Sequence, residues 1–250
     1  MNIHTADFNS YRPISNLSFV SKVLERIIDS RFTEHAISQR LLTQFQSAYR
    51  KHYSTETALV KVHNDLISAV DQGNVGALAL LDLSSAFDTV DHRLLLANLQ
   101  KRFAVTGPAL AWFRSYLADR TQTVHLQAQV SDTIRIDCGV PQGSVLGSKT
   151  FIAYVDKMED IFVAHGLHYH AFADDTQTYT NVPRSHTTTV APRLQNCIAE
   201  VVDWCGAHKL QLGMYRISGS GSGWPDIRPF LAIRFRFRQK YWPSPDIAAG

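Results

Sequence analysis

The amino-acid sequence predicts an α+β fold, on three observations. Residues 17–32 and 59–70 carry apolar side chains at the spacing of amphipathic helices, and residues 75–83 (VGALALLDL) form a short apolar run typical of a buried strand. Helical and extended patterns then follow one another without the regular strand–helix alternation of a doubly wound parallel sheet. With 250 residues, 45% of them hydrophobic, the chain has enough apolar mass for a core, which excludes a collagen-like or wholly disordered protein.

The helices expected in the first half are bounded by capping and stop signals. We expect the apolar faces of the two N-terminal helices to pack into the core, and Gly73 marks the expected end of the second. Asp91 is a good N-cap for a helix that continues to Phe103. Gly107, which is followed by a proline, opens a further helix.

The second half is predicted to hold two strand hairpins, each followed by a helix. In both hairpins apolar and polar residues alternate around a polar turn, and a glycine-rich turn (CGVPQGS) precedes the first of the two helices. The expected hairpins cover residues 123–137 and 168–180, and the expected helices include residues 151–161 and 189–206.

Histidines and cysteines give no sign of a zinc site or a disulfide framework. His168 and His170 alternate along an expected strand and therefore share a face, for which hydrogen bonding within the sheet is favoured over metal binding. Cys138, Cys197 and Cys205 form no CxxC pair, which favours a reducing compartment inside the cell, either nucleus or cytoplasm. No apolar run reaches the length of a membrane span and no signal peptide opens the chain, so we expect no membrane partner.

The positive charge is concentrated at the C-terminal end. The formal net charge is +3, and residues 214–250 hold six basic and two acidic side chains, so residues 1–213 carry −1. Composition alone therefore does not indicate a nucleic-acid-binding protein. Residues 219–223 (GSGSG) have the composition of a flexible linker, and residues 234–238 alternate arginine with phenylalanine. That stretch fits stacking on nucleic acid, an edge strand or sequence foreign to the fold, and we favour the last.

Three carboxylates stand out by their positions. Asp82 ends the apolar strand, and Asp174 and Asp175 lie at the bend of the second hairpin. Each signal is weak alone, because an Asp pair in a turn is more often structural, and Asp88 and Asp91 are interpreted as helix-start residues. Strand ends of one sheet can nevertheless bring the three together, and clustered carboxylates suit Mg²⁺ or Mn²⁺. Two such ions about 4 Å apart serve in-line displacement at phosphorus.

Six motifs, in a fixed order, closely resemble the reverse transcriptases of LINE-type (non-LTR) retrotransposons, and most closely those of Jockey-type elements. Those that resemble the family's palm motifs are LLDLSSAFDTVDH (80–92), GVPQGSVLG (139–147) and FADD (172–175). Those that resemble its two fingers motifs and the start of its fourth palm motif are YRPISNLSFVSKVLERI (11–27), QSAYRKHYSTETAL (46–59) and WCGAHKLQL (204–212).

The resemblance implies an α+β right-hand polymerase made of fingers and palm. Residues 1–75 would form the fingers, residues 76–213 the palm with interleaved fingers elements, and residues 214–250 an aberrant basic tail that is either disordered or foreign to the fold. No thumb is recognisable, and we expect it to be absent, as we do the nuclease domain that such elements carry upstream. The expectation is a fragment of a longer polyprotein.

The resemblance also implies roles for single residues at the metal site. Asp82 and Asp174 would be the metal-binding catalytic pair, with Asp175 in support, and the cofactor would be two Mg²⁺ ions, with Mn²⁺ as the alternative. Phe87, five residues after Asp82, matches the aromatic gate that excludes a ribose 2′-hydroxyl. The alternative interpretation of Phe87 is a core aromatic residue.

Substrate-contacting residues are implied elsewhere in the motifs. Gln142 and Gly143 match the turn that contacts the template and the incoming nucleotide. Arg12, Arg50 and Lys51 are candidates to bind the triphosphate, a task that suits the forked donors of arginine. For these three basic residues a solvated surface charge is an equally good interpretation.

Two departures from the family pattern bear on activity. After Gly147 the family continues with apolar residues, whereas this chain has Lys149 on the expected helix, where it should disturb packing or rearrange the helix start. After KLQL the chain continues with Gly213 rather than with the family's Asn and Lys-Thr pair. The lysine expected to protonate the pyrophosphate leaving group is therefore missing, and Lys209 is not its equivalent.

The function implied is RNA-directed DNA polymerisation, with an RNA template, a DNA primer or target and deoxynucleoside triphosphates as partners. One alternative is a catalytically inactive retroelement remnant that at most binds nucleic acid. Another is a two-metal phosphodiesterase, which would use the same carboxylates but does not explain the PQG turn or the aromatic residue after Asp82.

Overall fold

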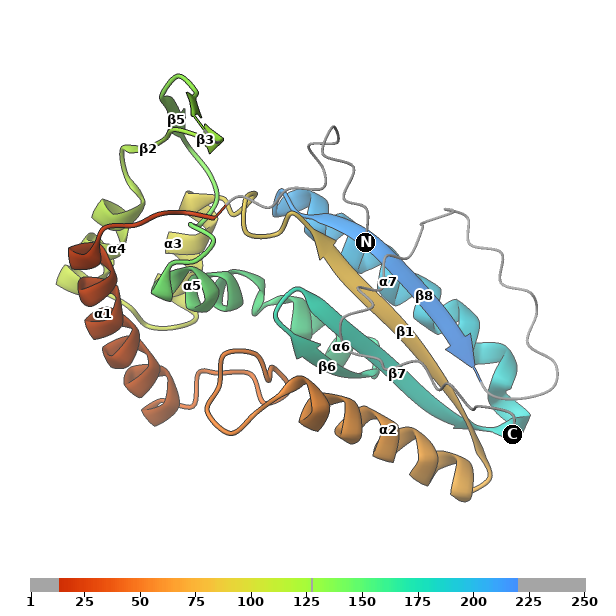
Figure 1. Cartoon of the computed structure of the whole chain (residues 1–250). Coiled ribbons are helices and arrows are strands. Elements are labelled where there is room, and N and C mark those ends of the chain that lie inside the picture. Colours follow the sequence, from red (N-terminus) through yellow and green to blue (C-terminus); the bar gives the residue numbers. More distant parts are fainter. Residues whose placement is uncertain (1–13, 127, 220–250) are drawn as a thin grey trace, which may run out of the picture.

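A computed structural model describes residues 14–126 and 128–219 of the chain. Its central feature is a four-stranded sheet in the order β6-β7-β1-β8, in which every neighbouring pair is antiparallel. The strands are β1 (Asn74–Ser84), β6 (His168–Phe172), β7 (Asp175–Pro183) and β8 (Gln211–Gly219). The α+β class is confirmed, and Figure 1 shows some helices along this sheet and a second group of helices beyond one of its ends. Arg12 and residues 220–250 lie outside the described residues.

The first three α-helices of the described chain begin at residues whose side chains cap them. Ser18, Ser54 and Asp91 accept backbone N–H groups at the starts of α1, α2 and α3, as expected for N-caps. Gly73, at φ +80°, follows the end of α2. The helices are α1 (Phe19–Ser38), α2 (Thr55–Asp71), α3 (His92–Lys101), α4 (Gly107–Leu117), α5 (Val145–Val155), α6 (Met158–Ala164) and α7 (Val190–Ala207), with a 3₁₀ helix at Arg184–Thr189.

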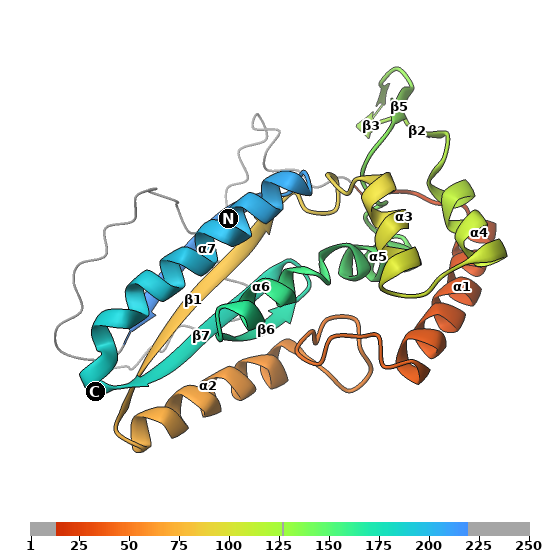
Figure 2. The same cartoon turned by 180° about the vertical axis from the view of Figure 1, so that it is seen from behind.

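The sheet has a core face and a more open face. Ala77, Ala79, Leu81 and Leu83 alternate along β1 and are buried in the main core, on the side that α6 and α7 cover in Figures 1 and 2. The intervening residues face the other way. There α2 packs against Gly76, where an added Cβ would lie 3.0 Å from a methyl group of Leu66, and covers only one end of the face. The opposite end is left more open.

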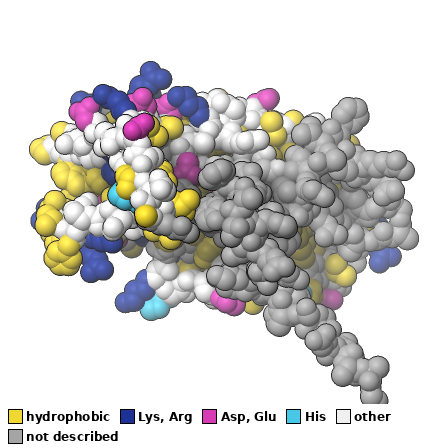
Figure 3. All heavy atoms as spheres, turned by 45° about the horizontal axis from the view of Figure 1, so that its top comes forward, with side chains coloured by type: hydrophobic (Ala, Val, Ile, Leu, Met, Phe, Trp, Pro, Cys, Tyr) yellow, Lys and Arg dark blue, Asp and Glu magenta, His cyan; other side chains and the backbone are white. Residues whose placement is uncertain are grey.

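The apolar faces of α1 and α2 correct one expectation. We expected these faces to enter the core, but the side chains that α1 buries are Glu25, Phe32 and Ala36. Phe19 is 81% exposed and Val20 67% exposed, because α1 contacts mainly α5 and does not pack along the sheet. Surface hydrophobic side chains are also visible over the described part of Figure 3. The remaining exposed apolar residues of the two helices are Val23, Leu24, Ile27, Ile37, Leu59, Val60, Ile67 and Val70.

The expected helix over residues 151–161 is interrupted. It forms two helices, because α5 ends at Val155 and α6 begins at Met158. Between them the buried Asp156 accepts a hydrogen bond from the Arg102 guanidinium, which also contacts Glu159 at 2.7 Å. This ion pair joins the break to α3.

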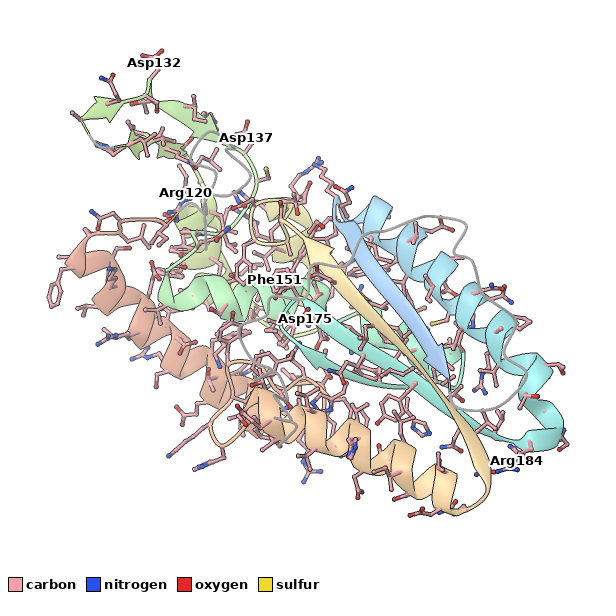
Figure 4. All side chains as sticks on the ribbon, turned by 45° about the vertical axis from the view of Figure 1, so that its right-hand side comes forward. Arg120, Asp132, Asp137, Phe151, Asp175 and Arg184 are labelled. Carbon is pink, nitrogen blue, oxygen red and sulfur yellow. The ribbon has the colours of Figure 1, made fainter. Side chains whose placement is uncertain are left out.

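The expected hairpin over residues 123–137 is confirmed in two short ladders. β2 (Arg120–Gln122) pairs with β5 (Ile134–Ile136), and β3 (His125–Leu126) pairs with β4 (Gln129–Val130). The hairpin projects away from the rest of the described chain, as the labelled Asp132 in Figure 4 shows. Within the described ranges, no helix is both long enough and apolar enough to cross a membrane.

Candidate active site

Two of the three predicted carboxylates are direct cross-strand neighbours. Asp82 on β1 pairs with Asp175 on β7, so both side chains project on the open face of the sheet. Asp82 is half-buried, and Asp175 is exposed. Figure 4 labels Asp175 near the middle of the described chain. The strand register therefore brings together residues that are more than ninety positions apart in the sequence.

The third carboxylate, Asp174, lies in the tight turn between β6 and β7. Phe172 pairs with Asp175, which leaves Ala173 and Asp174 as a two-residue connection. Ala173 adopts φ +59°, a left-handed conformation that such turns require and that glycine usually supplies. The carbonyl of Asp174 accepts a hydrogen bond from the Leu83 N–H at 3.3 Å, which ties the turn to β1 next to Asp82.

The electrostatics of the three carboxylates fit a cation. Burial by neighbouring atoms, together with the negative charges of Asp174 and Asp82, raises the pKa of the Asp175 carboxyl to about 6. Because Asp175 is an exposed residue, the repulsion among the three carboxylates is the cause that a bound cation would relieve. Oxygen-only donors suit Mg²⁺ or Mn²⁺. Among the described residues, no three or more His, Cys, Asp or Glu side chains lie close enough together to hold a metal ion as they stand.

A bulge in β8 lies beside this cluster. The β1–β8 register shifts between Asp82 and Leu83, where Gly213 is the extra residue. A Cβ at Gly213 would overlap the hydroxyl of Ser84 and lie 3.4 Å from the carbonyl oxygen of Asp82. Gly213, which follows KLQL in the sequence, is thus needed for the close approach of β8 to β1.

Phe87 follows the end of β1 and contacts α5. Its ring stacks on Phe151 with centroids 4.7 Å apart and an interplanar angle of 24°. The residue is half-buried and packs against the main core. The stacking fixes the orientation of the ring. This is compatible with both interpretations of Phe87, as the sugar gate and as a core aromatic residue.

The predicted PQG turn is held from two sides. The Gln142 amide donates to both carboxylate oxygens of Asp88 at 3.1 Å, and the Gln142 carbonyl accepts the Ser15 N–H at 2.9 Å. Gly143 adopts φ +93°, a conformation that side chains disfavour. Asp88 was interpreted as a helix-start residue, but α3 is capped by Asp91, and Asp88 instead orients Gln142.

Glu25 is a site-supporting residue that the sequence did not single out. The side chain is 1% exposed, and one carboxylate oxygen accepts the Val145 N–H at 2.7 Å and the Leu146 N–H at 3.2 Å. Ser144 accepts the next N–H, from Gly147, at 2.8 Å. The start of α5, which follows the PQG turn, is therefore capped by a charge from α1. Its partners lie 120 residues away, so no local pattern could reveal this role.

The basic residues predicted to bind a triphosphate occupy different settings. Arg50 donates from one guanidinium nitrogen to the carbonyls of Thr43 and Gln46, at 2.9 and 3.0 Å, so it braces its own loop. Lys51 is exposed. Arg12 lies outside the described residues.

Lys149 does not disturb α5. The helix begins at Val145, and Lys149 is half-buried with its ammonium group donating to the Tyr49 carbonyl at 2.7 Å. A long side chain can leave an apolar face and still place its charge on a polar partner. Lys209 likewise has a structural partner, because its ammonium group lies 2.6 Å from Asp91.

His168 and His170 share the open face, as predicted, through their pairing with Tyr179 and Gln177. The His168 ring stacks on Tyr179, and His170 is hydrogen-bonded to the Ser47 hydroxyl at 2.8 Å. The hydrogen-bonded sheet face is the arrangement that the sequence favoured.

Comparison with known proteins places this chain in a family. Residues 3–217 match the family model described as reverse transcriptase (RNA-dependent DNA polymerase). The "Probable RNA-directed DNA polymerase from transposon BS" of Drosophila melanogaster is 35% identical over 138 residues, which cover 55% of this chain and 15% of that protein. The RNA-directed DNA polymerase from mobile element jockey, also from Drosophila melanogaster, is 31% identical over 186 residues, covering 70% and 19%. The chain thus spans less than a fifth of the length of these curated relatives.

Solved structures share the fold at low identity. Apo telomerase from Candida tropicalis, truncated from its C-terminal domain, superposes with a TM-score of 0.57 at 13% identity, covering 81% of this chain and 41% of that one. A second apo telomerase structure from the same organism gives a TM-score of 0.56 at 11% identity, covering 80% and 37%. With the family model matched over most of its length, the chain belongs to the reverse transcriptase (RNA-dependent DNA polymerase) family, with LINE-type elements of the jockey kind among its relatives.

Proposed function

We propose that this chain carries the catalytic centre of an RNA-directed DNA polymerase, in which a primer 3′-hydroxyl attacks the α-phosphate of a deoxynucleoside triphosphate and releases pyrophosphate. The observation that carries the proposal is the pairing of Asp82 with Asp175 and the adjoining turn at Asp174, at the open end of the sheet. Membership of the reverse transcriptase family supports the same reaction.

Asp82 and Asp174 would hold the divalent ions, with Asp175 in support. Mg²⁺ is the proposed cofactor and Mn²⁺ the alternative, because all the candidate ligands are carboxylate oxygens. When bound, two such ions favour the ionised primer hydroxyl and stabilise the charge on the leaving group. The repulsion that raises the pKa of Asp175 is the electrostatic reason for a cation at this place.

Other residues of the chain would position the substrates. We assign Phe87 to the floor of the sugar site, because stacking on Phe151 fixes its ring. Gln142, oriented by Asp88, would contact the template and the incoming nucleotide with Gly143. Among the basic residues we assign triphosphate contact to Lys51 and Arg12, and give Arg50 the task of holding the loop that carries Lys51.

The proposed partners are an RNA template, a DNA primer or target and deoxynucleoside triphosphates. In the proposed division of the chain, residues 1–75 are fingers and residues 76–213 are palm with interleaved fingers elements. β8 extends to Gly219, so the last palm strand passes the proposed boundary by six residues.

Primer extension on poly(rA)/oligo(dT) with dTTP and Mg²⁺ tests the proposal. We expect the wild-type chain to extend the primer and Asp174→Ala to abolish extension. Asp132→Ala is the matched control, because this aspartate lies on the projecting hairpin away from the site.

Equal extension by wild type and Asp174→Ala would contradict the assignment of the site. Nucleic-acid binding without incorporation by the wild-type chain would instead favour the inactive remnant. Cleavage of the nucleic acid without incorporation would favour the phosphodiesterase.

A further inference from the structure

A short segment of the N-terminal third lies against the strand that precedes the Asp174 turn. β6 is an edge strand, and residues 45–48 run beside it in parallel. The Ala171 N–H donates to the Phe45 carbonyl at 2.7 Å, and the Ser47 N–H donates to the Ala171 carbonyl at 3.0 Å. This segment therefore covers the edge that β6 would otherwise present to solvent.

The side chain of Gln46 extends this contact to the turn itself. Gln46 is 5% exposed, and its Oε1 accepts two backbone N–H groups, from Ala48 at 2.9 Å and from Ala173 at 3.1 Å. One buried amide oxygen thus joins its own segment to the residue that immediately precedes Asp174.

The turn needs such support on this side. Ala173 holds φ +59°, which costs a residue with a Cβ more than it costs glycine. Beneath the turn lies a cavity of about 20 Å³, lined by Gln46, Ala173 and Thr176 among others, so packed side chains do not fill the space below it. On the opposite side Asp174 is tied to β1 through the Leu83 N–H.

We propose that Gln46 is a positioning residue for the catalytic turn: by accepting the Ala173 N–H it holds the left-handed turn and so fixes Asp174 for metal binding. The inference rests on the proposed function, because Asp174 is assigned there as a metal ligand.

The test measures Mn²⁺ binding to the full chain by the electron paramagnetic resonance signal of free Mn²⁺, with primer extension in parallel. Gln46→Met removes the acceptor at nearly constant size, and Gln46→Glu keeps an acceptor oxygen. Ser47→Ala is the matched control, because it removes the neighbouring bond to His170 and leaves the turn untouched. Gln46→Met loses the bonds to Ala48 and Ala173, and the loss of the Ala173 bond, which holds the turn, predicts about a fivefold to tenfold rise in the Mn²⁺ dissociation constant.

The control variants sharpen the outcome. The Mn²⁺ dissociation constants of Gln46→Glu and Ser47→Ala should stay within about twofold of the wild-type value, since both variants retain the bond to Ala173. The double variant Gln46→Met/Ala173→Gly should regain most of the affinity, because glycine adopts the left-handed conformation without support. That double variant also covers the case in which Gln46→Met alone does not fold.

Unchanged Mn²⁺ affinity in Gln46→Met would overturn the inference. A loss of Mn²⁺ affinity that the added Ala173→Gly does not recover would also overturn it, as would a double variant that fails to fold. In either case the damage would lie in residues 45–48 and not in the turn. The wild-type chain keeps the two proposals apart. Mn²⁺ binding and extension by wild type with no effect of Gln46→Met would refute only the positioning role, whereas absence of both in wild type would refute the polymerase assignment.

Discussion

Replacing Glu25 tests how the N-terminal helix α1 organises the PQG turn. One oxygen of this buried carboxylate accepts the N–H groups of Val145 and Leu146, and the other accepts the Ser21 hydroxyl at 3.1 Å. Glu25→Ala would leave two N–H groups at the start of α5 without a partner.

The magnitude follows from the number and charge of these bonds. Hydrogen bonds to a charged acceptor contribute about 1.5 kcal/mol each, so Glu25→Ala should lower the free energy of unfolding by about 3 kcal/mol. Glu25→Gln keeps one oxygen where both N–H groups already converge and loses only the attraction of the charge to the helix start, so it should cost about 1 kcal/mol.

Urea unfolding followed by circular dichroism measures both effects. Glu34→Ala is the matched control, because Glu34 is an exposed residue on the same helix and should change the free energy by no more than about 0.5 kcal/mol. Equal losses for Glu25→Ala and Glu34→Ala would refute the capping role. Equal losses for Glu25→Ala and Glu25→Gln would refute the argument that the shared oxygen carries most of the effect.

Further predictions concern the break between α5 and α6 and the bulge in β8. Arg102→Met should cost about 3 kcal/mol in urea unfolding, because it leaves the buried Asp156 carboxylate without its cation. Burial raises the pKa of the Asp156 carboxyl to about 6, although Arg102 acts to lower it. The carboxylates near Arg102 raise the pKa of its guanidinium group more than desolvation lowers it. The cost of burial therefore falls on Asp156. The unfolded chain binds fewer protons at this carboxyl between pH 4 and 6, so the stability that it contributes should fall as pH rises through that window. Because the pKa of Asp175 is also raised to about 6, unfolding of Asp156→Asn should show a smaller slope than wild type in the same window. Gly213→Val should lower the thermal midpoint and weaken Mn²⁺ binding, because a side chain there collides with Ser84 beside Asp82, whereas no change in either measurement would contradict the close approach.

The parts of the fold that local patterns control were predictable. Asp91 caps α3 where the sequence places a capping residue, and the expected β6–β7 hairpin forms. Its turn is Ala173 and Asp174, one residue before the expected bend, because Asp175 already pairs with Phe172. The convergence of Asp82 with Asp175 followed from the argument that strand ends of one sheet meet. Their catalytic roles stay predictions.

Long-range polar contacts were not predictable, because their partners are distant in sequence. Glu25 looked like one of the polar residues between apolar positions of a helix, yet it is buried against α5. Arg50 was a candidate to bind a triphosphate because arginine has forked donors, but one nitrogen of its guanidinium group donates to two nearby carbonyls. The break after Val155 depends on Arg102, which no periodicity within residues 145–161 could indicate.

The central claim is that the carboxylates gathered at the ends of β1 and the β6–β7 hairpin carry out nucleotidyl transfer. Single-turnover primer extension by Asp82→Asn, Asp174→Asn and Asp175→Asn, with Asp137→Asn on the projecting hairpin as control, tests it most directly. We expect Asp82→Asn and Asp174→Asn to lose extension, Asp175→Asn to keep part of it, and the control to match wild type. Full activity of Asp82→Asn or Asp174→Asn would contradict the account.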